Sequence, residues 1–116
     1  MTSRSRVSEV ALAAVRRYCE SRTPPDLRDK LRLDVVVRGP TITIFDARPR
    51  WHAEVGPEWT QTSVAQFRFD ASRGLWSLYW ADRNSRWHLY DDVEPSANIV
   101  DLLEEVDEDP TGIFYG

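Results

Sequence analysis

The 116-residue sequence contains few of the residues on which several protein classes depend. It has one cysteine, Cys19, which excludes an internal disulfide and a zinc site built from several thiolates. No apolar run approaches the roughly 20 residues that a membrane-spanning helix requires. The start of the chain is polar and an amphipathic stripe follows it, so we expect no secretory signal. These absences favour a cytoplasmic protein with a single domain over residues 1–116.

Lysine is nearly absent as well, since Lys30 is the one lysine among 15 basic residues and the rest are arginine. Residues 1–50 hold eleven basic and six acidic residues, whereas residues 51–116 hold four and thirteen. The net charge of −4 is therefore the difference between a basic first half and an acidic second half. Five Trp, four Tyr and four Phe are far more aromatic residues than disordered chains carry, so a folded core is expected.

Apolar residues at steps of three and four predict two amphipathic helices, one near each end of the chain. The first covers about 5–22, with Ser5 as its N-cap and the pair Pro24-Pro25 after its end. The second covers about 96–106, with Ser96 as its N-cap. The tail 107–116 ends in apolar residues, and we expect it to pack on the domain's own core. Addition of that tail to the sheet edge of a partner is the alternative.

Between the helices, the apolar period falls to two, which is typical of strands. A hairpin is predicted over 31–48, with a turn at Gly39-Pro40 that places Val37 opposite Ile42. A long loop is predicted over 49–62 and a three-stranded meander over 63–90. The fold class is therefore α+β: an antiparallel sheet of about five strands with both helices packed on one face.

The turn clusters within the meander predict its register. Phe69 is expected opposite Trp76, and Tyr79 opposite His88. The alternation then divides the meander into an apolar face and a polar face. The predicted polar face consists of Val64, Gln66, Arg68, Ser77, Tyr79, Arg86, His88 and Tyr90.

Several stretches of the chain resemble a family of small bacterial single-domain proteins that is catalogued as a domain of unknown function. The stretches are Tyr18-Cys19-Glu20 with Pro24-Pro25 after it, Leu31-Arg32-Leu33, the segment from Trp76 to Tyr90, and the ending Asp107-Glu108-Asp109-Pro110-Thr111-Gly112-Ile113-Phe114. The W-x-L-Y-W and D-P-T-G-I-F motifs are the most specific of these. The resemblance implies a small bacterial protein and implies no activity, ligand or catalytic residue.

The residues themselves predict no catalytic group, no cofactor and no metal site. His52, His88 and Cys19 are the available nitrogen and sulfur ligands, and they fall on a loop, a strand and a helix without zinc-like spacing. Gln66, Tyr79 and His88 in one cross-strand row are the one arrangement that could act as an acid or base. Such a row is more typical of solvated cross-strand packing.

The sequence instead favours a non-catalytic protein-interaction module, whose partner is an unidentified protein or a second copy of the chain. The candidate interaction surface combines the aromatic loop with the polar sheet face: Trp51, His52, Trp59, Arg68, Tyr79, Arg86, His88 and Tyr90. Alternatively, the two loop tryptophans fold back over the sheet as lids on the core.

Two other functions stay open at this point. A nucleic-acid accessory protein would use the arginine-rich first half, although residues 91–109 hold nine acidic residues and no basic one. A small-molecule or enzymatic site on the Tyr79 and His88 face is the third.

Overall fold

The computed structural model describes residues 8–52, 54 and 56–115. One helix lies near each end of the chain, and the strands lie between the two helices in the sequence. The elements are α1 (Glu9–Arg22), the 3₁₀ turn η1 (Pro25–Leu27), β1 (Arg32–Arg38), β2 (Thr41–His52), β3 (Gly56–Asp70), β4 (Leu75–Ala81), β5 (Trp87–Leu89) and α2 (Ile99–Glu108). The predicted α+β class is confirmed. Within the described ranges, no helix is both long and apolar enough to cross a membrane.

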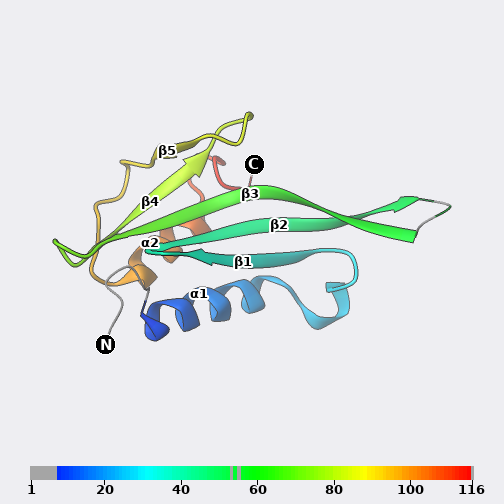
Figure 1. The fold of residues 1–116 in the computed structure, drawn as a ribbon, viewed down its shortest axis with the longest axis horizontal. Helices are drawn as coiled ribbons and strands as arrows, with labels where there is room; N and C mark the ends of the chain where they lie inside the picture. Colours follow the sequence, from blue (N-terminus) through cyan, green and yellow to red (C-terminus); the bar gives the residue numbers. More distant parts are fainter. Residues whose placement is uncertain (1–7, 53, 55, 116) are drawn as a thin grey trace.

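The five strands form one antiparallel sheet whose spatial order is their chain order, β1-β2-β3-β4-β5 (Figure 1). The predicted pairing of Val37 with Ile42 is confirmed. The predicted pairing of Phe69 with Trp76 across the β3–β4 turn is confirmed as well. Because a one-residue slip would turn every side chain to the other face, these two registers determine which residues of β1 to β4 reach the core.

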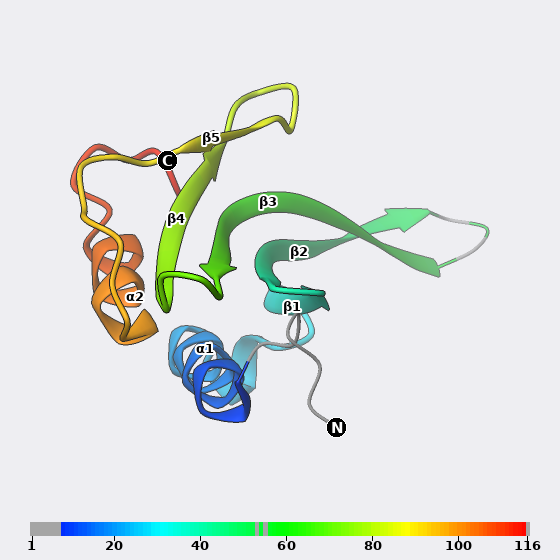
Figure 2. The same ribbon diagram turned by 60° about the vertical axis from the view of Figure 1, so that its left-hand side comes forward.

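Both helices lie on the same side of the sheet, α1 beside β1 and α2 beside β4 (Figure 2). The core lies between them and the sheet. Its largest fully buried side chains come from the helices and from β2, β3 and β4: Val15, Ile42, Ile44, Phe67, Leu78, Leu102 and Val106. Each such side chain contributes about 1.5–3 kcal/mol relative to an exposed one. Cys19 belongs to this core and is 5% exposed.

The helix starts differ from the predicted ones. Ser8 caps α1 by accepting a 3.0 Å hydrogen bond from the Ala11 amide, while the predicted cap Ser5 lies outside the described residues. Asn98 caps α2 instead of Ser96. Ser96 exchanges two backbone hydrogen bonds with Trp76 of β4, and this extended pairing prevents it from starting a helix.

The predicted loop over 49–62 is wrong, because most of it is β-strand. β2 runs to His52 and β3 begins at Gly56, and the two pair from Thr41 opposite Arg68 to His52 opposite Gly56, with one irregularity between Ile44 and Phe45. The far end of this hairpin, residues 48–52 and 56–61, is called the arm below; it projects beyond the other strands (Figure 1). Pro49 lies within β2 although proline cannot donate a ladder hydrogen bond. Past Ala47, however, β2 has β3 as its one described neighbour, so the other side of the strand requires no donor.

The predicted β4–β5 register is also wrong, by one residue. Trp80 lies opposite His88, and Tyr79 lies opposite Leu89. The turn between the strands holds three residues rather than two or four, because Asp82 donates its amide to the Arg86 carbonyl at 2.9 Å. Ser85 closes this turn in the left-handed region, with φ of 62°. Because the turn has an odd number of residues, His88 lies on the same face as Trp80, and Leu89 lies beside Tyr79.

The C-terminal tail packs on its own domain, as expected. Asp109 ends α2 in the left-handed region, and its carboxylate accepts hydrogen bonds from the amides of Phe114 and Tyr115 at 3.0 and 2.9 Å. Phe114 is 5% exposed and its ring lies 5.0 Å from that of Tyr90. The Tyr115 hydroxyl lies 2.7 Å from that of Tyr18 on α1. The contacts of the D-P-T-G-I-F motif therefore hold the C-terminal tail against the core.

Candidate functional site

The sheet has one face that no helix covers within the described chain, and we call it the open face. Its centre is a connected set of polar and aromatic side chains on β2, β3 and β4. The Arg68 guanidinium lies 3.8 Å from the centre of the Tyr79 ring, and Arg68 Nε donates to Gln66 Oε1 at 2.7 Å. Gln66 Nε2 in turn donates to Thr43 Oγ1 at 3.0 Å. These contacts hold Arg68 flat on the sheet, where it presents a cation backed by an aromatic ring.

The open face continues onto the base of the arm. The Arg32 guanidinium of β1 lies 4.0 Å from the centre of the Trp59 ring. Asp34 accepts hydrogen bonds from Arg32 Nε at 3.0 Å and from Gln61 Nε2 at 2.8 Å. Trp59 is half-buried under Arg32, so it is neither a lid over the core nor a fully exposed side chain.

Of the predicted interaction surface, the structure brings Arg68 and Tyr79 together, with Trp59 further along the same face. Trp51 and His52 lie at the far end of the arm, opposite Pro57 and Gly56, and their side chains fall outside the described part of the structure.

The other three residues are not part of this surface, which corrects the prediction. Arg86 lies in the β4–β5 turn. His88 stacks on Trp80 with ring centres 4.6 Å apart, and its Nε2 lies 2.8 Å from Asp82 Oδ2. Tyr90 is 4% exposed and packs toward α2, where its hydroxyl donates to Glu105 at 2.6 Å. Val64 is likewise buried at 2% exposure, at the irregularity where β3 pairs with Ile44 and Phe45.

The pKa shifts of Asp82 and Tyr90 come from hydrogen bonds and burial within the fold. The hydrogen bond from His88, with amide bonds from the turn, lowers the pKa of Asp82 to about 2. Burial raises the pKa of the Tyr90 hydroxyl, and the bond to Glu105 raises it further. The predicted row of Gln66, Tyr79 and His88 is not assembled, because the residue opposite Tyr79 is Leu89. The proposed acid–base site on this face therefore has no geometric basis.

The sequence reasoning missed a cavity of about 510 Å³ at the β4–β5 end of the open face. The Tyr90 amide donates to the Leu78 carbonyl, and Ser96 pairs with Trp76. The segment from Tyr90 to Ser96 is longer than the stretch of β4 between Leu78 and Trp76, so this segment bulges outward. The cavity is lined by the bulge, by β3, β4 and β5, and by the β3–β4 turn, and its charged groups are Arg68, Asp70, Arg73, Asp91 and Glu94. The signal in the sequence was the acidic run ending in a proline, Asp91-Asp92-Val93-Glu94-Pro95.

The described residues contain no group of three or more His, Cys, Asp or Glu side chains that could hold a metal ion. Cys19 is 5% exposed, and burial raises the pKa of its thiol to about 12. The open face presents arginine, aromatic and amide groups on β2, β3 and β4.

The architecture places the chain among α+β domains built on a five-stranded antiparallel meander with one open face. Residues 3–116 match the family described as a domain of unknown function (DUF3024), and the chain belongs to that family. This confirms the resemblance of the sequence motifs over nearly the whole chain. No curated protein and no solved structure matches the chain.

Proposed function

We propose that this domain is a non-catalytic protein-interaction module, and that its contact surface is the arm together with the open face. The observation that carries the proposal is the arm itself. Beyond the pairing of Arg32 with Ala47, β2 and β3 have no third strand among the described residues. A projecting two-stranded ribbon adds little to the hydrophobic core of its own domain.

The dimensions of the domain support this interpretation. The radius of gyration is 15.1 Å and the longest axis is 51 Å. A compact domain of this length has a radius of gyration of about 13 Å. A two-stranded hairpin is marginally stable in water unless something packs against it. In this chain the Arg32–Trp59 stack holds the base of the arm, and a partner would cover the rest.

The charge pattern favours a protein partner over nucleic acid. Two arginines near the arm are already neutralised: Arg32 pairs with Asp34 at 3.0 Å, and Arg48 pairs with Asp46 at 3.2 Å. Phosphate binding depends on basic side chains that can replace counterions. Arginine and aromatic residues held on a polar face are instead typical of protein interfaces. A cytoplasmic setting is part of the proposal, supported by the lone cysteine.

The test is affinity capture from a lysate of the encoding organism, at moderate salt, with and without nuclease treatment, using matched variants. In Trp59→Ala combined with Tyr79→Ala, both cation–π contacts of the surface are lost. Each costs about 0.5–1 kcal/mol at an exposed site, so the domain stays folded. Val100→Ala is the control, because Val100 is 42% exposed on α2, on the helix side of the sheet.

The proposal expects a stoichiometric protein that the wild type and the control retain and the double variant loses. Sedimentation velocity over a range of concentrations shows whether that protein is a second copy of the chain. Capture that is equal for all three proteins would contradict the proposal. Recovery of nucleic acid that disappears with nuclease, with no protein dependent on Trp59 and Tyr79, would contradict it in favour of nucleic-acid binding.

A further inference from the structure

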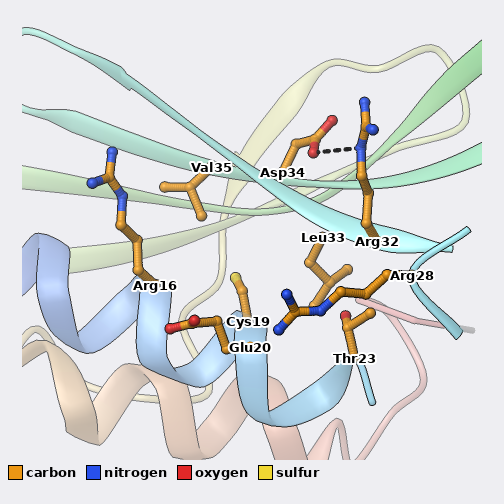
Figure 3. A pocket seen from close by; sticks show the side chains of 9 residues that line it. All are labelled: Arg16, Cys19, Glu20, Thr23, Arg28, Arg32, Leu33, Asp34 and Val35. Atoms are coloured by element: carbon orange, nitrogen blue, oxygen red, sulfur yellow. Dashed lines mark hydrogen bonds and ion pairs between the residues drawn. The ribbon is translucent and has the colours of Figure 1, made fainter. Parts of the chain in front are cut away.

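A second recess lies between α1 and β1, at the β1 edge of the sheet (Figure 3). Its volume is about 570 Å³, which is in the range of small-molecule sites. The apolar lining consists of Cys19 from α1 and of Leu33 and Val35 from β1. Figure 3 shows Leu33 directed down toward α1, whereas Arg32 and Asp34 point the other way. The alternation of β1 therefore gives the recess an apolar wall.

Thr23 supplies a polar group whose bonding is incomplete. It follows α1 as its C-cap and lines the recess at 4% exposure. Its Oγ1 is buried and has no hydrogen-bond partner in the described structure. A buried hydroxyl without a partner costs about 1–3 kcal/mol, so such a group is retained against a stability cost. A ligand that accepts a hydrogen bond would satisfy it.

Two arginines flank the same recess with their charges unpaired. Arg16 projects from α1, and Arg28 follows η1 and reaches back toward Cys19 and Glu20 (Figure 3). Within the described chain neither guanidinium forms an ion pair or a hydrogen bond. Arg32 and Asp34 also line the recess, but they pair with each other at 3.0 Å. The free cations are therefore Arg16 and Arg28, set against one acidic neighbour, Glu20.

From this arrangement we propose that the recess binds a small monocarboxylate with an apolar body. The carboxylate pairs with Arg28, whose planar donors match its two oxygens, and it accepts a hydrogen bond from Thr23, while Arg16 adds a positive charge further along α1. The apolar body lies on Leu33 and Val35. A phosphate dianion fits less well, because Glu20 and the C-terminal carbonyls of α1 are close by and repel a second negative charge. The recess shares Arg32 and Asp34 with the edge of the open face, but the groups proposed to hold the ligand, Arg28 and Thr23, are not part of that face, so this proposal does not depend on the proposed function.

The experiment titrates the folded protein with sodium hexanoate and follows backbone amide shifts by NMR. Hexanol has the same chain without the charge, and inorganic phosphate has charge without the chain. The expected result is a millimolar dissociation constant for hexanoate, with the amides of Cys19, Leu33 and Val35 shifting. Hexanol and phosphate are expected to bind at least tenfold more weakly. Absence of hexanoate binding at about 50 mM, or binding as tight for either of the other two probes, would overturn the proposal.

Variants assign the binding to the named groups. Arg28→Gln is expected to weaken hexanoate about tenfold, as loss of a charged hydrogen-bond partner does, and Arg16→Gln to weaken it less, because Arg16 acts through its charge alone. Arg17→Gln is the matched control, since Arg17 lies on α1 but does not line this recess. Thr23→Val keeps the shape and removes the unpartnered hydroxyl, so the protein should melt no lower while hexanoate binds several-fold more weakly. An Arg17 effect equal to that of Arg28, or unchanged affinity in Thr23→Val, would show that the recess is not the site.

Discussion

Replacement of Asp109 is expected to show how much stability the folded-back tail contributes. The Asp109 carboxylate accepts two amide hydrogen bonds, from Phe114 and Tyr115. Hydrogen bonds to charged groups contribute about 1.5–3 kcal/mol each, and these lie near the lower end because Asp109 is half-buried. Asp109→Ala therefore removes about 3 kcal/mol of unfolding free energy. For a domain of this length, the loss corresponds to roughly 12 °C in melting temperature.

A glycine at the same position separates the hydrogen bonds from the backbone conformation. Asp109 has φ of 44° and ψ of 58°, the left-handed region, which costs alanine about 1 kcal/mol more than glycine. Asp109→Gly should therefore be about 1 kcal/mol more stable than Asp109→Ala, although both lose the same two bonds. Urea unfolding followed by tryptophan fluorescence measures both values.

The neighbouring Glu108→Ala is the control, because Glu108 is exposed and no cap depends on it. It should change stability by less than about 0.5 kcal/mol. If Asp109→Ala is no more destabilising than this control, or if the glycine and alanine variants are equally stable, the account of the motif as a tail clasp is wrong.

Three further outcomes follow from single contacts. Tyr90→Phe removes the 2.6 Å bond to Glu105 and should lower the unfolding free energy by about 1 kcal/mol, whereas an unchanged urea midpoint would contradict the buried bond. Gly74→Ala should cost about 1 kcal/mol although the added methyl meets nothing within 4 Å, because Gly74 has φ of 67°; a neutral result would show that the turn relaxes. The pKa of Asp82 is lowered to about 2 in the folded state, so its stabilising contribution is present above the ordinary value of 3.8 and is lost as the pH falls toward 2. Urea midpoints between pH 2 and 6 should fall less steeply in Asp82→Asn than in the wild type, and parallel curves would contradict the His88–Asp82 contact.

The sequence predicted the fold wherever a strong apolar period coincided with a decisive turn. The β1–β2 register followed from Val37 and Ile42 on either side of Gly39-Pro40, because a two-residue turn leaves a single pairing that buries both. The β4–β5 register could not be obtained in this way. Ser85 adopts a left-handed conformation, which the residue type does not indicate. The additional turn residue places His88 on the face predicted for Leu89, and Leu89 on the face predicted for His88.

The candidate surface was predicted only in part, for a related reason. Arg68 and Tyr79 were placed correctly because their strands belong to the part of the sheet whose other face is buried. The described side chains of the arm belong to no core cluster, so no buried alternation marks its strands, and Pro49 and a run of polar residues resemble a loop. The recess between α1 and β1 combines residues from distant segments. No local pattern could have assembled Arg16, Thr23 and Arg28 into one site.

The uneven support of β3 has a consequence for how the molecule moves. Near Phe67 the strand has β2 on one side and β4 on the other, whereas near Trp59 it has β2 alone. Amide hydrogens along one continuous strand should therefore exchange in two regimes, slowly where opening requires loss of the core and quickly where it requires only fraying of the arm. The same fifteen-residue strand can remain folded at one end while it is reshaped at the other. A partner that binds the arm would then have to offset the conformational entropy lost on ordering the arm, and not that of the rest of the sheet.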